Sequence, residues 1–256
     1  MQSIRAYELI KETFLRKSYI WIVHLSWLGI YVLFGLLFLP TGEEVGLFVF
    51  IWGGFFLPLV LSAGIFGDDV ASGRICVLAT RPVWLGEFYI YRLLGLSLQG
   101  AVHLLLAGGL IFALDALLQP GSSSSLGLWL FSSWLLFNAC AALSTSLSVV
   151  VKGAYNSLVL LLAVVIGFLL LDVLAGYWLE RGAADAVRAV VRYAGPPVSL
   201  LNRLAKGEYG KYSLGVSKCD LMKTVACTVH CLILTTAYCV VGILILTRRQ
   251  FSAQRE

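Results

Sequence analysis

Residues 93–114 read LLGLSLQGAVHLLLAGGLIFAL and contain no Asp, Glu, Lys or Arg. The stretch lies between Arg92 and Asp115. As a helix rising about 1.5 Å per residue, it covers roughly the 30 Å hydrocarbon core of a bilayer. An uncharged stretch of this length predicts a transmembrane helix, because the apolar runs of soluble core helices are usually shorter.

Other stretches share this property, namely 18–42, 45–67, 116–151, 153–171 and 224–247. The stretch 116–151 is too long for one span, and Gln119-Pro120-Gly121 with the four serines that follow predicts a loop inside it. The stretch 153–171 continues past one acid, Asp172, to Trp178. We therefore predict six transmembrane helices, at about 19–39, 46–67, 93–118, 127–151, 154–179 and 223–247.

The composition of the whole chain agrees with this assignment. Of its 256 residues, 59% are hydrophobic and 13% are charged, whereas a soluble domain carries about 25% charged residues. These values exclude a soluble globule, and they also exclude a disordered chain, which needs low hydrophobicity and high charge density. We expect one all-α integral membrane domain over residues 1–256, in contact with membrane lipids and without a nucleic-acid partner.

The distribution of basic residues predicts the orientation. Six spans place both termini on one side of the membrane, where 11 of the 19 Lys and Arg residues fall, while the other eight lie in or beside residues 180–223. Basic residues near helix ends favour the cytoplasm. We therefore predict a multi-pass cell-membrane protein with both termini in the cytoplasm.

The N-terminal segment, residues 1–18, predicts a short amphipathic helix. Ile4, Tyr7, Ile10 and Phe14 share one helical face, and most of the charged residues lie elsewhere. Such a helix rests in the membrane interface before the first span. The alternative is an amphipathic start to the first helix with no role of its own.

Between the second and third spans lies a cytoplasmic segment, residues 68–92, which reads DDVASGRICVLATRPVWLGEFYIYR. Ser72-Gly73 predicts a turn, residues 75–80 a short apolar helix, and Pro82 a second turn. Arg81 should be extended because the proline ring disfavours helical geometry in the residue before it. A short helix between two turns is a rigid protrusion, and such a protrusion is suited to docking against a partner.

This segment resembles the cytoplasmic coupling region of type-2 ABC exporter permeases. In that pattern an acid precedes a glycine, an apolar stretch leads to Arg-Pro-Val, and an acid and a Lys follow. Arg81-Pro82-Val83 matches directly, whereas Arg74 replaces a Thr, Trp84-Leu85 replaces Ser-Arg, and Arg92 stands where Lys is usual. The residues that the resemblance implies in coupling are Asp69, Gly73, Arg74, Ile75, Leu78, Arg81, Pro82, Glu87 and Arg92.

The layout of nearly the whole chain resembles the same family, which includes permeases labelled as multicopper-enzyme maturation transporters. The resemblance implies a non-catalytic permease subunit of an exporter, located in the bacterial inner membrane. It also implies two partners, a cytoplasmic ABC ATPase and a second permease copy. ATP and Mg²⁺ would be bound by the ATPase, and we expect no cofactor in this chain.

The chain itself contains no Walker A motif, which needs G-x-x-x-x-G-K-[ST]. Its single Gly-Lys pair, Gly210-Lys211, is followed by Tyr212 and lies in the outer loop. Any ATP hydrolysis therefore has to come from another polypeptide.

The outer loop, residues 180–222, predicts an amphipathic helix over 183–193 that ends before Gly195-Pro196-Pro197. Residues 198–201 then return toward the bilayer. In the family an outer element of this kind caps the translocation path, so Pro196 and Pro197 are candidate gate residues. A solvated linker is the alternative.

Polar residues inside the predicted spans are candidates for the translocation path, because they are costly in a bilayer and often functional. They are His103, Asn138 and Asp172. The alternative for His103 and Asn138 is a polar contact between helices. The alternative for Asp172 is pairing with a basic group of the outer loop.

Cys227, His230 and Cys231 are spaced i, i+3 and i+4 on the last span, which places them on one helical face. Thiolates and imidazole suit Cu(I) or zinc. The alternative is helix packing by small cysteines. If these residues bind metal, the protein would be a metal-handling maturation factor, and an envelope-assembly scaffold is a further alternative to transport.

Overall fold

The computed structural model describes residues 2–15, 18–38, 45–63, 65–73, 84–118, 126–151, 154–177, 181–206, 211–213, 216–218 and 221–248. Over these residues the chain is almost entirely helical. The N-terminal part contains α1 (Gln2–Leu15), α2 (Ser18–Phe38), α3 (Val45–Phe48), the π-helix η2 (Val49–Phe56), α4 (Leu57–Ser62) and α5 (Gly67–Ala71). The remainder contains α7 (Leu85–Leu118), α8 (Leu126–Val150), α9 (Ala154–Tyr177), α10 (Arg181–Ala194), α11 (Val198–Ala205), β1 (Lys211–Ser213), β2 (Val216–Lys218) and α12 (Leu221–Arg248).

Among the described residues, four helical segments are long and apolar enough to cross a membrane, namely Gly46–Asp69, Leu85–Leu118, Leu126–Val150 and Thr224–Arg248. The first of these comprises most of α3 together with η2, α4 and part of α5. Shorter apolar helical segments, Trp21–Leu37 and Leu158–Phe168, lie within α2 and α9. The predicted helical class is therefore confirmed, and the four long apolar segments are compatible with the predicted multi-pass membrane protein.

The structure adds details that the hydrophobicity pattern did not contain. β1 and β2 form an antiparallel pair within the predicted outer loop, residues 180–222, with Tyr212 opposite Ser217. Three-residue strands are too short to give a recognisable alternation of polar and apolar residues. The predicted short helix over residues 75–80 lies outside the described residues.

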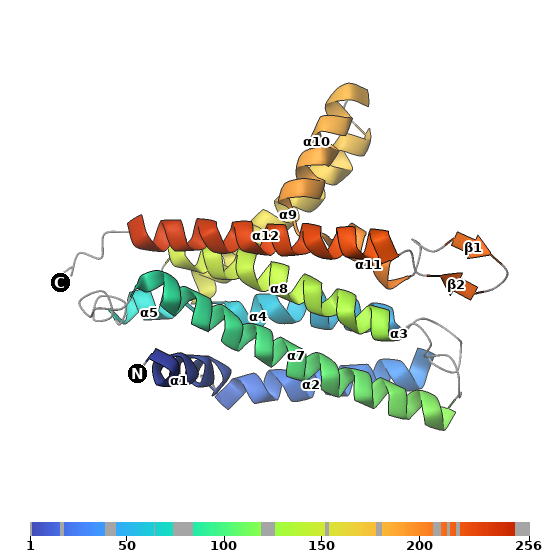
Figure 1. Ribbon diagram of the computed structural model, residues 1–256, viewed down its shortest axis with the longest axis horizontal. Coiled ribbons are helices and arrows are strands. Elements are labelled where there is room, and N and C mark those ends of the chain that lie inside the picture. The colour runs from blue at the N-terminus through green and yellow to red at the C-terminus, as the bar shows by residue number, and fades with distance from the viewer. Residues whose placement is uncertain are drawn as a thin grey trace.

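Helix α8 lies at the centre of the arrangement, with α12 on one side and α7 on the other (Figure 1). It also contacts η2, α4, α9 and α11. Helices α1 and α2 lie along α7. Figure 1 shows α1 and the last turn of α12 at the same end of the bundle, here named the terminal end; the other end is the far end.

The residues of α8 explain its central place. Its buried face includes many small or hydroxyl-bearing residues, namely Ala139, Ala141, Ala142, Ser144, Thr145, Ser146 and Ser148. Small side chains let neighbouring helices approach closely. The hydroxyls of Thr145 and Ser146 donate to the carbonyl oxygens of Ala141 and Ala142, so they are satisfied within the helix itself.

A polar contact joins α7, α8 and α12 toward the terminal end. The Tyr89 hydroxyl lies 2.9 Å from the Ser146 hydroxyl, whose single proton is shared between the carbonyl oxygens of Ala142 at 2.8 Å and Tyr238 at 2.6 Å. Gly242 on α12 faces Tyr89, and a Cβ there would overlap the phenol oxygen. The absence of a side chain at Gly242 is therefore what lets α12 come this close.

We predict that Gly242→Val lowers the stability of the bundle by about 1–3 kcal/mol, the usual cost of overpacking a close contact. Thermal unfolding in detergent measures the change. Gly167→Val on α9 is the matched control, because nothing lies within 4 Å of a Cβ at that position. Equal melting temperatures for the two variants would contradict the predicted contact.

Candidate functional site

Arg92 is completely buried at the terminal end of α7, at 0% exposure. Its Nη2 atom lies 3.3 Å from Oδ2 of Asp69 and 3.4 Å from Oε1 of Glu12. Its Nη1 atom donates to the hydroxyl of Thr13 at 3.1 Å. Glu12, Thr13, Asp69 and Arg92 are named here the buried ionic cluster.

Local features of three segments bring the cluster together. Asp69 lies in α5, where the segment Gly46–Asp69 reaches the terminal end, and it is 1% exposed. The Thr13 hydroxyl donates to the carbonyl oxygen of Leu9, so its oxygen is oriented to accept from Arg92. Gly95 lies nearly one turn after Arg92, and a Cβ there would meet Thr13 and the carbonyl of Ile10. Helix α1 therefore packs directly on the backbone of α7.

The buried side of α1 includes Thr13 together with Ile10 and Phe14 of the predicted apolar face. Thr13 is buried and Ile10 is half-buried, whereas Tyr7 is 62% exposed. The hydrophobic pattern missed Thr13 because its role is to accept a hydrogen bond, which hydrophobicity does not register. It also missed Glu12, whose partner lies on a helix 80 residues later.

Electrostatics makes the cluster a strong constraint. A buried charge is tolerated when it is paired and hydrogen-bonded, and removing one partner of a buried ion pair costs about 3–5 kcal/mol. The guanidinium carbon also lies 5.0 Å from the centre of the Phe88 ring, a cation–π contact. The cluster thus holds α1, α5 and α7 at fixed positions relative to one another.

Directly after the cluster, α5 ends in a fixed turn. The amide of Ser72 donates to the carbonyl of Asp68 at 2.9 Å, and Gly73 follows with a φ of +70°. Glycine adopts this left-handed conformation without steric cost, whereas other residues are strained. The direction in which the chain leaves α5 therefore depends on Gly73.

The predicted coupling residues divide into two groups. Asp69 and Arg92 are in direct contact, Gly73 forms the turn beyond them, and Glu87 lies half-buried in the first turn of α7. The other predicted coupling residues lie outside the described residues, namely Arg74, Ile75, Leu78, Arg81 and Pro82.

His103, a predicted path residue, contacts other helices. Its Nδ1 atom lies 3.0 Å from Nδ1 of His24 on α2, and its Nε2 atom lies 3.3 Å from the hydroxyl of Tyr31. The contact therefore holds α2 against α7. Sequence spacing could not reveal His24 and Tyr31 as partners, because they lie on another helix.

The other two path candidates have different surroundings. The Asn138 amide donates to the carbonyl of Trp134 within α8 at 2.7 Å, and the residue is half-buried. Asp172 belongs to α9, and the surroundings of its side chain lie outside the described part of the structure.

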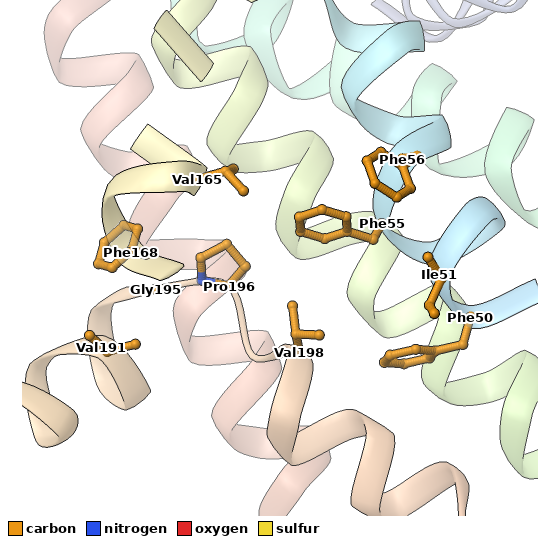
Figure 2. A pocket seen from close by; sticks show the side chains of 10 residues that line it. All are labelled: Phe50, Ile51, Phe55, Phe56, Val165, Phe168, Val191, Gly195, Pro196 and Val198. Carbon is orange, nitrogen blue, oxygen red and sulfur yellow. The ribbon is translucent and has the colours of Figure 1, made fainter. Parts of the chain in front are cut away.

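An apolar pocket of about 320 Å³ lies between η2 and α9 (Figure 2). Its lining comprises Phe50, Ile51, Phe55 and Phe56 of η2, Val165 and Phe168 of α9, Val191 of α10, and Gly195, Pro196 and Val198 of the connection to α11. This set is named here the apolar pocket. A π-helix is rare and is frequently found at functional sites, and sequence periodicity gave no sign of this one.

The candidate gate residues lie at the edge of this pocket. Pro196 lines it, and Pro197 is the buried residue that precedes α11. Helix α11 then packs against α8 and buries Leu201 and Leu204. The Tyr238 hydroxyl donates to the carbonyl of Ala194 at 2.5 Å, which fixes the end of α10 to α12.

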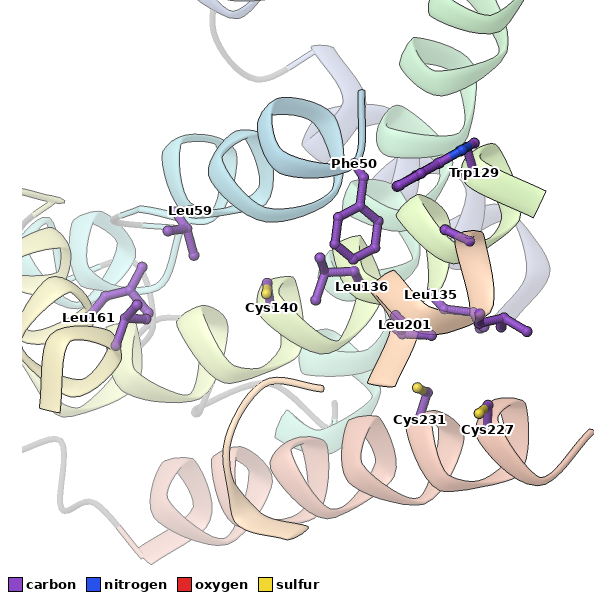
Figure 3. Packing of buried hydrophobic residues seen from close by; sticks show 13 residues of the cluster. Phe50, Leu59, Trp129, Leu135, Leu136, Cys140, Leu161, Leu201, Cys227 and Cys231 are labelled. Carbon is purple, nitrogen blue, oxygen red and sulfur yellow. The ribbon is translucent and has the colours of Figure 1, made fainter. Parts of the chain in front are cut away.

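The candidate metal ligands on α12 face different surroundings. Cys227 and Cys231 are buried in an apolar cluster with Leu201 (Figure 3). The His230 ring instead makes an edge contact with the Tyr193 ring of α10, and the two ring centres are 5.6 Å apart. Across the part of the chain that the structure describes, no group of three or more His, Cys, Asp and Glu side chains could hold a metal ion.

No family model matches this chain, and no curated protein matches it significantly. The class of this protein therefore has to be inferred from its own fold and candidate site. It is a helical protein with four described segments long and apolar enough to cross a membrane, a buried ionic cluster at the terminal end and an apolar pocket between η2 and α9.

We predict that Arg92→Met lowers the melting temperature, because the buried Asp69 and the partly exposed Glu12 lose the positive charge that contacts them. Arg92→Met combined with Asp69→Leu should recover part of the loss, since an apolar pair of similar volume replaces the ion pair. Lys11→Met, at an exposed position of α1, is the control. Thermal unfolding in detergent measures all three, and a double variant less stable than Arg92→Met would refute the pairing.

Proposed function

We propose that this chain is the membrane-spanning permease subunit of an ABC-type exporter. It would form the translocation path and couple to a separate cytoplasmic ATPase, with a second permease copy completing the transporter. In this proposal α2 and α9 also cross the membrane, giving six spans in a bacterial inner membrane with both termini in the cytoplasm. The chain then has no enzymatic activity, and the ATPase binds ATP and Mg²⁺.

The observation that carries the proposal is the buried ionic cluster. Asp69 and Arg92 stand on either side of the segment that resembles the coupling region of type-2 exporter permeases, and their side chains are in contact. The two ends of that segment are therefore held together. A push on the segment would move its base as one unit, which is what docking of an ATPase requires.

The same cluster suggests how movement would spread. Glu12 and Thr13 tie α1 to this base, and α7 continues for its whole length toward the far end. Packed helices and ionic networks with two discrete arrangements can carry a coupling free energy between distant sites. A displacement of α7 would reach α8, which contacts η2 beside the apolar pocket.

We predict that Gly73→Val uncouples the transporter while the membrane bundle stays folded. A valine at a φ of +70° costs about 1–2 kcal/mol and would redirect the chain as it leaves α5. Affinity purification in mild detergent, followed by identification of co-purifying proteins and an ATPase assay, gives the readout. The expected result is a co-purifying Walker A protein with the unchanged chain and its loss, or loss of its stimulation, with Gly73→Val.

Gly29→Val on α2 is the matched control, because nothing lies within 4 Å of a Cβ there. A Gly73→Val chain that retains its partner and full activity would contradict the coupling role. Purification of the unchanged chain with bound metal and no ATPase would instead favour the metal-handling alternative.

A further inference from the structure

The side chains that line the apolar pocket consist of hydrocarbon groups alone. None of its ten lining residues has a nitrogen or oxygen atom in its side chain, apart from the ring nitrogen of Pro196, which belongs to the backbone. Four of the ten are phenylalanines, three on η2 and one on α9. Its volume of about 320 Å³ falls at the lower end of the range of about 300–1,000 Å³ for small-molecule sites.

The pocket is positioned by the way α9 leaves the bundle. The first half of α9 packs into the bundle through Leu161 and Val165, and α9 then contacts α10. Figure 1 shows α10 standing away from the long axis of the bundle. The apolar pocket is the space that this departure leaves between α9 and η2. Figure 2 shows Phe55 and Val165 on its opposite sides.

The apolar pocket is open on one side. Ile51 and Phe56, which line it, are each 37% exposed, and both belong to the membrane-crossing segment Gly46–Asp69. A molecule in the surrounding bilayer can therefore enter without crossing the bundle.

The chemistry of the lining decides which occupant it favours. A polar group placed there would lose its hydrogen bonds to water and find no side-chain partner, at a cost of about 2–7 kcal/mol. An empty apolar space is also unfavourable, because the atoms around it lose dispersion contacts. A narrow, flexible alkyl chain restores those contacts and needs no hydrogen bond.

We propose that the apolar pocket binds the hydrocarbon chain of an amphiphile. This inference rests on the proposed function in one respect, since it names the class of cargo: a lipid-like molecule with an alkyl tail, rather than an ion or a free sugar. As a binding site, however, the pocket stands on its own geometry. The chain could belong to a transported amphiphile or to a resident bilayer lipid, and the experiment separates these sources.

The test uses the full chain, purified with any partner that accompanies it and placed in phosphatidylcholine nanodiscs. A fatty acid with a diazirine in the middle of its chain is the probe, and irradiation followed by mass spectrometry locates the attached carbon. We expect labelling on η2 and α9 that an excess of unlabelled fatty acid removes. Labelling of these helices that is not removed by competitor would overturn the proposal, because it would reflect simple exposure to lipid.

Variants that fill the pocket give the second arm. Val165→Trp and Ile51→Trp place a bulky ring in the space from α9 and from η2 respectively, and each should abolish the competed labelling. Two variants on different helices guard against one failing to fold. Val240→Trp is the matched control, because Val240 is 49% exposed on α12, away from the pocket. Retention of competed labelling in both filled variants would also overturn the proposal.

The labelling does not require ATP. A failure of the pocket proposal can therefore be distinguished from a failure of the exporter proposal. Competed labelling without any ATPase partner would support the pocket and count against the exporter. With a partner present, loss of label from the pocket during ATP hydrolysis identifies a transported amphiphile, and unchanged label identifies a resident lipid. Crosslinks from one copy of the chain to another across η2 and α9, with no fatty-acid labelling, would show that a second copy fills the space and would overturn the proposal.

Discussion

The position of Arg92 constrains the terminal end of the bundle more strongly than any other interaction described. A guanidinium at 0% exposure has to be surrounded by acceptors, because an unpaired buried charge would cost several kcal/mol. Those acceptors come from two other helices, Glu12 and Thr13 from α1 and Asp69 from α5. The ends of α1, α5 and α7 therefore have little freedom to rearrange separately, and α1 is part of the bundle.

The rest of the architecture follows from how α8 satisfies its own polar groups. The hydroxyl groups of Ser133 and Thr145 on its buried face donate to the carbonyl oxygens four residues earlier, those of Trp129 and Ala141. The helix can consequently offer a small, apolar surface on several sides while carrying many Ser and Thr residues. This surface lets η2, α7 and α12 approach closely, with Gly242 and Gly54 at points where a side chain would collide.

The sequence predicted the helices well because each span is a long uncharged stretch, and length and charge are local properties. Predicted span 127–151 corresponds to α8 at Leu126–Val150, and predicted span 223–247 to α12 at Leu221–Arg248. Asp69, Gly73 and Arg92 were predicted as a group from their order in a motif, but the motif did not state that Asp69 and Arg92 touch. The contacts of Glu12 and His24 were not predictable, because they depend on how helices rotate against each other. The π-helix was missed because its extra residue per turn leaves no trace in a wholly apolar stretch.

The terminal end and the apolar pocket differ in the kind of interaction that holds them. At the terminal end, ionic and hydrogen-bonded contacts have a definite geometry, so a small displacement either preserves or breaks them. At the apolar pocket, aromatic and aliphatic side chains meet without directional bonds, and η2 and α9 can slide or separate at little cost in hydrogen bonding. Lipid tails are as apolar as these side chains, so separation there exposes no new surface to water. In the proposed transporter, α7 and α8 would carry a displacement of the buried ionic cluster toward η2, which α8 contacts. The apolar pocket, which no directional bond between its lining side chains holds closed, would then be the part of the bundle best able to change its volume.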